Sequence, residues 1–196
     1  ALPKRFTDVN ITMGYPMRST PVYTLLQIVF SLQENATRFN IHSKDGELKF
    51  YHHDIIRLLR HPYFIATSLH PDTLIEIIRQ IGRRNLTFAT ASRLKEIGGS
   101  EFHHERWFIP WKDANDCITQ LRELISELRA VFNKREDSSL DVEYLYQFHL
   151  TLNKIATLIG DSPEFANVAA IKALVLQIFA AGTIPFSCEH IAGLQV

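Results

Sequence analysis

Apolar residues recur at intervals of three and four along most of this chain, which places them on one face of an α-helix. Four segments show this pattern most strongly, and they begin at Pro21, Lys112, Ser139 and Asn167. Shorter periodic stretches cover 54–60 and 70–82. The sequence therefore predicts a mainly α fold, a multi-helix bundle.

Punctuating residues indicate where these helices begin and end. Thr20 can cap a helix that has Pro21 at its first position. Pro62 is expected to end the helix over 54–60, because the residue before a proline is pushed out of the α region. The helix over 167–181 is apolar on nearly every side, which predicts burial inside the bundle. The stretch 83–111 shows the least regular pattern.

Strand signals are short and lie mainly near the two chain ends. Val9, Ile11 and Met13 alternate with polar residues, which is the period of a strand. A second strand is expected from Thr183 to Ser187, and a third over 47–51. The bundle should thus carry a few short peripheral β-strands at the chain ends and near 47–51.

Composition limits the number of domains and the kind of partner. The chain has 196 residues, 46% of them hydrophobic, which suits a single helical domain over 1–196. Lys and Arg number 21, as do Asp and Glu, so any nucleic-acid contact needs a local basic patch. Two distant cysteines, and the lack of an apolar run of membrane length, predict a cytoplasmic protein with no membrane partner.

The best local basic patch lies in the irregular middle of the chain. Only Glu76 and Glu96 lie close by in sequence to offset its charge. We interpret four of its residues as a candidate DNA-binding set: Arg83, Arg84, Arg93 and Lys95. The alternative is a solvated surface without a partner.

Patterns that would indicate catalysis are missing from the sequence. It has no glycine-rich phosphate loop and no spaced carboxylate–lysine constellation of a nuclease. His52-His53 and His103-His104 are adjacent pairs, whose members are expected to point apart rather than share a metal. We therefore expect no catalytic, cofactor or metal site. Two pairs of residues are expected in the core rather than as a nucleophile or a base-stacking platform: Cys117 with Cys188, and Trp107 with Trp111.

Two stretches of sequence resemble a known family. The first is VNITMGYPMRSTPVY, which contains Gly14, Tyr15 and Pro16. It resembles the segment after the first strand of the second motor half in AddAB/RecB-like helicase–nuclease proteins, above all bacterial proteins that also carry a PD-(D/E)XK nuclease domain. The second is IPFSCEHIAGLQV, which is similar to the family stretch F-x-G-E-P-x-x-G-L-Q. Its matching residues include Glu189, Gly193 and Gln195, whereas Cys188 and His190 replace the usual glycine and proline.

The resemblance implies a helical subdomain inserted into the second motor half of a longer protein. Segments 1–18 and 183–196 would then be strands of the adjoining motor domain. It implies a non-catalytic role in DNA repair and recombination, in which the domain positions DNA or a helicase partner subunit. The ATPase and nuclease sites of the parent protein would lie elsewhere. The alternative is a helical protein–protein interaction module with no DNA contact of its own.

Overall fold

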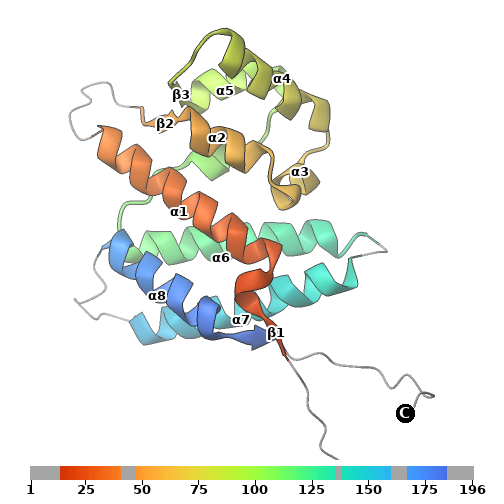
Figure 1. The fold of residues 1–196 in the computed structure, drawn as a ribbon, viewed down its shortest axis with the longest axis vertical. Helices are drawn as coiled ribbons and strands as arrows, with labels where there is room; N and C mark the ends of the chain where they lie inside the picture. The colour runs from red at the N-terminus through yellow and green to blue at the C-terminus, as the bar shows by residue number, and fades with distance from the viewer. Residues whose placement is uncertain (1–13, 41–46, 136–137, 160–166, 185–196) are drawn as a thin grey trace, which may run out of the picture.

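The computed structural model describes residues 14–40, 47–135, 138–159 and 167–184. Within these ranges the chain forms eight α-helices and four short strands, which confirms the mainly α fold (Figure 1). The helices are α1 (Pro21–Asn40), α2 (His52–Leu59), α3 (Pro62–Thr67), α4 (Pro71–Arg83), α5 (Ala91–Gly98), α6 (Ala114–Phe132), α7 (Ser139–Ile159) and α8 (Val168–Ala181). The strands are β1 (Tyr15–Pro16), β2 (Lys49–Tyr51), β3 (Phe88–Thr90) and β4 (Thr183–Ile184).

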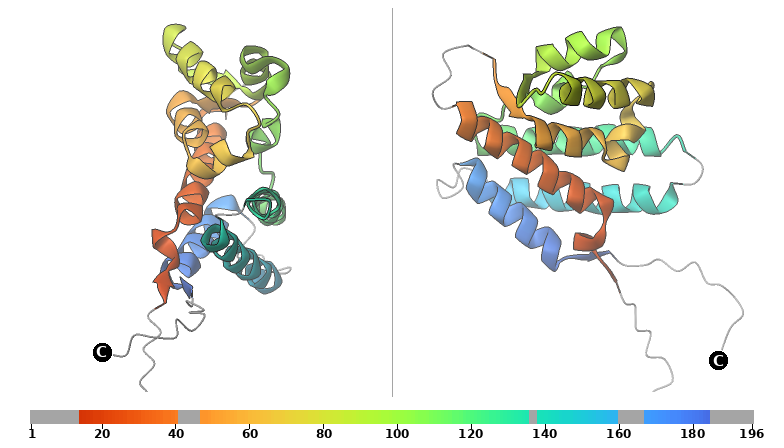
Figure 2. Two further views of the ribbon diagram at one scale, coloured as in Figure 1. Left: turned by 90° about the vertical axis from the view of Figure 1, so that its right-hand side faces the viewer. Right: turned by 45° about the horizontal axis from the view of Figure 1, so that its top comes forward.

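Two groups of elements pack against α1. The long helices α6, α7 and α8 lie on one side, and α6 and α7 run antiparallel beside each other (Figure 1). The shorter helices α2 to α5 form the other group, and the antiparallel pair β2–β3 lies with them (Figure 2). The helix α1 contacts members of both groups, so it joins them into one body.

The core is continuous through both groups, but α8 occupies its edge. The rings of Phe148 on α7 and Phe179 on α8 stack with centroids 4.1 Å apart, and both side chains are fully buried. Only one stripe of α8 is buried, formed by Ile171, Val175 and Phe179. The prediction that α8 is buried on all sides is therefore wrong, because neighbouring helices cover one face of this helix only.

The structure contains elements that periodicity did not predict. Pro62 ends one helix as expected, but it also begins α3 as its first residue. The stretch from 83 to 111 contains β3, α5 and two 3₁₀ turns, Gly99–Glu101 and Glu105–Phe108. The helix α5 ends at Gly98, and the next residue, Gly99, has a φ of 63°, which favours glycine. These elements are too short to show a hydrophobic period.

The cap of α3 is a buried histidine. The Nδ1 atom of His61 accepts a hydrogen bond from the Tyr63 N–H at 3.2 Å, and the residue is 6% exposed. Burial lowers the pKa of His61 from 6.5 to about 4, although a hydrogen bond with the Pro21 backbone opposes the shift. The folded protein thus keeps this imidazole neutral where the unfolded chain protonates it.

We expect His61→Asn to reduce the loss of stability in mild acid. The pKa of His61 is lower in the folded protein than in the unfolded chain. Its contribution to the free energy of unfolding is therefore complete above about pH 6.5 and is lost as the pH falls towards 4. Within that window wild type should lose up to about 1.4 kcal/mol per pH unit through this residue. Asparagine keeps a capping acceptor but does not titrate. Urea unfolding across this range measures the slope.

The exposed His53→Asn provides the matched control for the change from histidine to asparagine itself. Burial also lowers the pKa of His104 and His149, so the slope of the His61 variant should flatten without vanishing. If the His61 variant kept the wild-type slope, His61 would not be a source of the loss of stability in acid.

Candidate functional site

The first and last described strands meet at one edge of the bundle, and we call this place the β1–β4 junction. The pair is antiparallel, with Tyr15 opposite Ile184 and Pro16 opposite Thr183. Beside it, the Met17 N–H donates a hydrogen bond to the Gly182 carbonyl oxygen at 3.0 Å. The chain therefore enters and leaves the helical region at the same place (Figures 1 and 2).

The junction is tight because two glycines allow close approach. A Cβ atom on Gly14 would lie 2.8 Å from the Thr183 Cβ atom, and one on Gly182 would lie 2.6 Å from the Met17 sulfur. Tyr15 secures the junction to α7, because its ring stacks on that of Tyr144 with centroids 5.7 Å apart. Two of the three family-motif residues in the first segment, Gly14 and Tyr15, thus have structural roles here.

The other predictions about the chain ends fall largely outside the described ranges. The strand expected over residues 9–13 lies there, as do the motif residues Glu189, Gly193 and Gln195. Of the strand expected at 183–187, the structure describes β4 alone.

We expect Gly14→Ala to destabilise the fold by about 1–3 kcal/mol, because an added methyl group must displace Thr183 from a closely packed position. Gly82→Ala is the matched control. A Cβ atom there meets nothing within 4 Å, and Gly82 lies inside α4, so alanine should stabilise by about 0.5–1 kcal/mol. Urea unfolding of both variants checks this pair. If both substitutions changed the free energy of unfolding equally, close packing of Thr183 against Gly14 would be contradicted.

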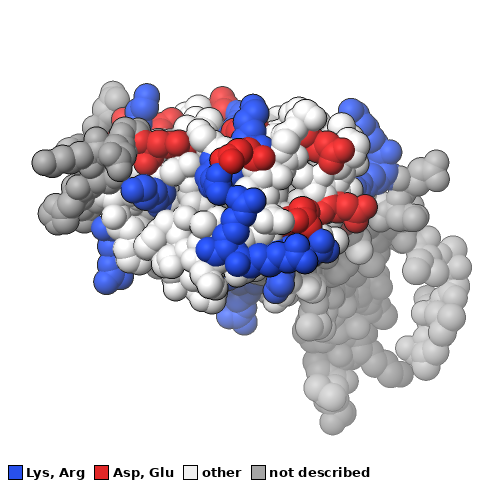
Figure 3. Space-filling model, turned by 90° about the horizontal axis from the view of Figure 1, so that it is seen from above, with Lys and Arg blue, Asp and Glu red and all other residues white. Residues whose placement is uncertain are grey.

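The four predicted DNA-binding residues lie on the part of the surface that α4 and α5 form. Arg83 and Arg84 lie at the C-terminal end of α4, whereas Arg93 and Lys95 belong to α5, which packs against α4. Figure 3 views the molecule from this end, where Lys and Arg side chains form a band with acidic side chains beside it.

Ion pairs divide this set into two kinds. Arg93 pairs with Glu96 on the same helix, and Lys95 pairs with Glu105. The hydrogen bond from Lys95 is the main reason why the pKa of Glu105 is lowered. These two cations are therefore already compensated by neighbouring carboxylates.

Arg83 and Arg84 are less compensated. Both are exposed, and the Nε atom of Arg84 donates to the neutral Gln80 side chain at 3.0 Å. The carboxylate of Glu76 lies in the field of Arg83 but forms its ion pair with Arg79, at 2.6 Å. The end of α4 is thus the more suitable place for a phosphate contact, although arginine at a helix C-terminus is also favoured by the helix dipole.

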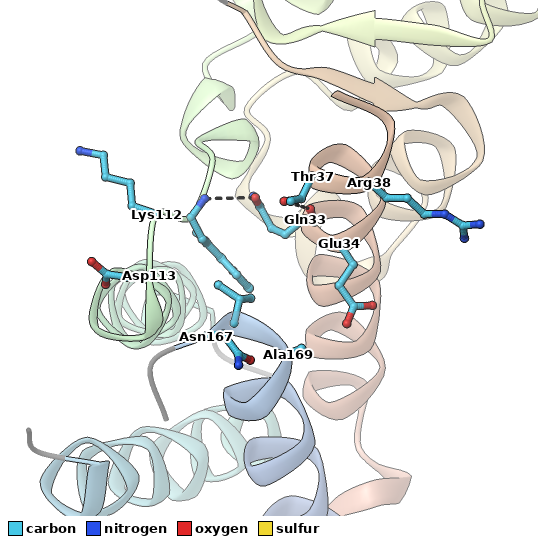
Figure 4. Close-up of a pocket in the computed structure, with 10 residues that line it drawn as sticks. Gln33, Glu34, Thr37, Arg38, Lys112, Asp113, Asn167 and Ala169 are labelled. Atoms are coloured by element: carbon cyan, nitrogen blue, oxygen red, sulfur yellow. Dashed lines mark hydrogen bonds between the residues drawn. The ribbon is translucent and has the colours of Figure 1, made fainter. Parts of the chain in front are cut away.

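A hollow of about 540 Å³ lies where α1, the segment before α6 and the start of α8 come together (Figure 4). Gln33 spans its inner side, with Nε2 donating to the Ile109 carbonyl oxygen at 2.8 Å and Oε1 accepting from the Trp111 N–H at 3.3 Å. At the rim Lys172 donates to Glu34 at 2.6 Å.

The polar groups around this hollow are engaged in holding the fold. Asp113 caps α6 by accepting from the Asp116 N–H at 2.8 Å, and Asn167 caps α8 by accepting from the Ala170 N–H at 2.8 Å. Among the described residues that line the hollow, both acidic side chains, Glu34 and Asp113, thus have partners already. Sequence analysis did not indicate the hollow, because it forms between segments far apart along the chain.

Cys117 and His104 are buried, whereas His53 is exposed. The rings of His52 and His53 lie with centroids 4.2 Å apart, so the expectation that they point apart is wrong for this pair. His104 is buried against Phe64. Burial raises the pKa of the Cys117 thiol, which makes it a poor nucleophile. Within the described residues, no three His, Cys, Asp or Glu side chains gather closely enough to hold a metal ion.

The two tryptophans form part of the core, as expected. Trp107 is 2% exposed and Trp111 is 9% exposed. The ring of Trp111 meets that of Phe30 edge-on, with centroids 5.2 Å apart. With so little of either side chain exposed, stacking on a base is not the main role of these rings.

The arrangement defines a helical bundle with a two-stranded junction and an arginine-bearing surface. Comparisons of the chain with protein-family models, curated protein sequences and solved structures found no match. Among the described helices, none has both the length and the apolar composition needed to cross a membrane.

Proposed function

We propose that this chain is a non-catalytic helical domain of an AddAB/RecB-like helicase–nuclease, a bacterial cytoplasmic protein that acts in DNA repair and recombination. The domain would be inserted in the second motor half of a protein that also carries a PD-(D/E)XK nuclease. Its role is to position DNA, or a helicase partner subunit, during the processing of DNA ends.

The observation that carries this proposal is the β1–β4 junction. A domain inserted between two strands of another domain needs an entry and an exit that lie side by side, and β1 pairs directly with β4. The residues Gly14 and Tyr15, which carry part of the family resemblance, lie at this junction and hold it closed. The strands can therefore continue into a neighbouring motor domain as adjacent segments.

Contact with DNA is assigned mainly to the C-terminal end of α4. Arg83 and Arg84 are exposed, and no carboxylate of the described residues is bonded to either guanidinium group. Arg93 and Lys95, by contrast, must break their ion pairs with Glu96 and Glu105 to reach a phosphate. Few phosphates can be engaged by so small a set, so binding should be weak and independent of sequence. On this proposal the chain by itself neither hydrolyses ATP nor cuts DNA, and it needs no cofactor.

We expect Arg83→Ala combined with Arg84→Ala to make DNA binding less dependent on salt. Each lost phosphate contact reduces the slope of log affinity against log salt by roughly one unit, so the slope should fall by about two. Fluorescence anisotropy with a tailed duplex at several salt concentrations measures this slope. Arg93→Ala with Lys95→Ala should change it less, because those charges are already paired.

The control for lost charge is Lys112→Ala with Lys134→Ala, two exposed lysines outside the α4–α5 surface. Their removal should leave the slope close to that of wild type. If the Arg83–Arg84 and Lys112–Lys134 double variants reduce the salt slope equally, the overall charge of the protein, rather than the end of α4, is responsible for DNA binding. If wild type does not bind at low salt, DNA contact by this domain is refuted.

An apolar groove favours the alternative, a protein–protein interaction module. The groove lies between α2, α3 and α4, has a volume of about 330 Å³, and is lined by Leu59, Arg60, Ile65, Pro71, Leu74, Ile75 and Ile78. Leu69, which follows α3, is 87% exposed. Exposed apolar surface of this kind is typical of a docking site. Failure of DNA binding together with an intact β1–β4 junction would make this alternative the better explanation.

A further inference from the structure

A second basic surface, which sequence analysis did not indicate, follows the seam between α6 and α7. Arg122 and Arg129 lie seven positions apart on α6, so they project from one side of the helix at an interval of about two turns. Across the seam, His149 of α7 is close enough for the charges of both arginines to lower its pKa. The guanidinium carbon of Arg129 lies 5.3 Å from the centroid of the Tyr146 ring. We call these residues, with Asn153, the seam cluster.

The seam cluster contains polar atoms that lack partners. The Nε atom of Arg129, the Nδ1 atom of His149 and the Oδ1 atom of Asn153 are all buried without a hydrogen bond. His149 and Asn153 lie four positions apart on α7, so their side chains share one face. Buried polar atoms normally have a partner, because leaving one unsatisfied is unfavourable. Three such atoms along one seam indicate a place where a polar ligand would complete the bonding.

The charge of the cluster is not neutralised by nearby acids. On α6, Glu123 forms its ion pair with Arg106, and the same arginine acts on the carboxyl group of Glu127. On α7, Glu143 accepts a hydrogen bond from Gln147 at 2.7 Å. Among the described residues, no carboxylate forms an ion pair with Arg122 or Arg129. Within the part of the chain that the structure describes, the seam therefore combines two guanidinium groups that form no ion pair with an imidazole whose Nδ1 atom has no hydrogen-bond partner.

We infer that Arg122, Arg129 and His149 bind a phosphate group at the α6–α7 seam. A guanidinium group presents several N–H donors in a planar fork that matches phosphate oxygens, and two of them flank the imidazole here. A half-turn of the Asn153 amide would present its NH₂ group to the same ligand. The phosphate can belong to a nucleic-acid backbone or to a free phosphate compound, because both offer the same oxygens. This inference does not depend on the function proposed above.

Ligand binding at this position has a direct spectroscopic consequence. Burial lowers the pKa of His149, and the charges of Arg129 and Arg122 lower it further. A bound phosphate places negative charge beside the imidazole, which favours its protonated form. Binding should therefore raise the pKa of His149, whereas an anion held elsewhere on the surface would not.

The test is an NMR titration of the His149 ring protons in the whole chain, with that signal assigned by its loss in His149→Gln. Inorganic phosphate and a short single-stranded oligonucleotide are added separately, each at constant ionic strength against chloride. We expect the pKa of His149 to rise with inorganic phosphate. Arg122→Gln with Arg129→Gln should weaken phosphate binding at least about tenfold, because each guanidinium donates charged hydrogen bonds.

Two further variants separate the site from general effects. Arg122→Gln alone removes an exposed side chain and preserves the packing of Arg129, so it should also weaken binding in a folded protein. The matched control is Arg57→Gln with Arg60→Gln, two exposed arginines on and beside α2, which should bind phosphate like wild type. Similar losses in this control and in the seam variants would overturn the proposal.

The two ligands distinguish the source of the phosphate. A rise in the pKa of His149 with the oligonucleotide supports the site and identifies a nucleic-acid backbone as its ligand. A rise with inorganic phosphate alone supports the site for free phosphate compounds. No rise with either ligand overturns the inference. These outcomes are independent of the Arg83 and Arg84 salt slopes, so either proposal can fail while the other stands.

Discussion

The helix α1 holds the structure together, because both groups of helices pack against it. Its apolar side chains are almost all buried, yet it also uses polar side chains to fix its neighbours. Asp54 of α2 is 4% exposed and accepts hydrogen bonds from Ser31 at 3.2 Å and from Asn35 at 2.7 Å. A buried carboxylate is tolerated only with such partners, so its position sets how α2 lies on α1. Gln33 does the same for the segment before α6. The register of these contacts places the α4–α5 surface at one end of the molecule and the junction at the other.

Sequence periodicity predicted the long helices well and the short elements poorly, for a physical reason. A helix as long as α6 or α7 repeats its buried face several times, whereas α3 and α5 complete too few turns to show a repeat. The apolar composition of α8 was misread as complete burial, because periodicity cannot tell a central helix from one at the edge. The pairing of β1 with β4 joins residues from opposite ends of the chain, which no local pattern can indicate.

The candidate sites show the same limit. Clustering in sequence placed Arg83, Arg84, Arg93 and Lys95 on one part of the surface, but it could not show which charges are neutralised. The partner of Lys95 is Glu105, which the turns after α5 bring back towards that helix. The seam cluster could not be predicted from the sequence, because Arg122 and His149 belong to different helices and come within range of each other's charge only after α6 and α7 pair. A net charge of zero therefore hides both compensated and uncompensated regions.

Function in this fold depends on where the uncompensated cations lie relative to the β1–β4 junction. The junction fixes the point at which the bundle would attach to a neighbouring domain. From there α1 extends to β2 and α2, and α4 and α5 lie beyond these elements (Figure 1). Arg83 and Arg84 lie at the end of α4, away from the junction. On the proposed function, they would touch DNA held by a neighbouring motor domain only if the duplex passes over that end. The apolar groove between α2, α3 and α4 is lined in part by α4, the helix at whose end these two arginines lie. A partner seated there would cover the apolar side of α4, the helix that ends at Arg83, so on the two proposed functions a docked partner and bound DNA would both contact this helix.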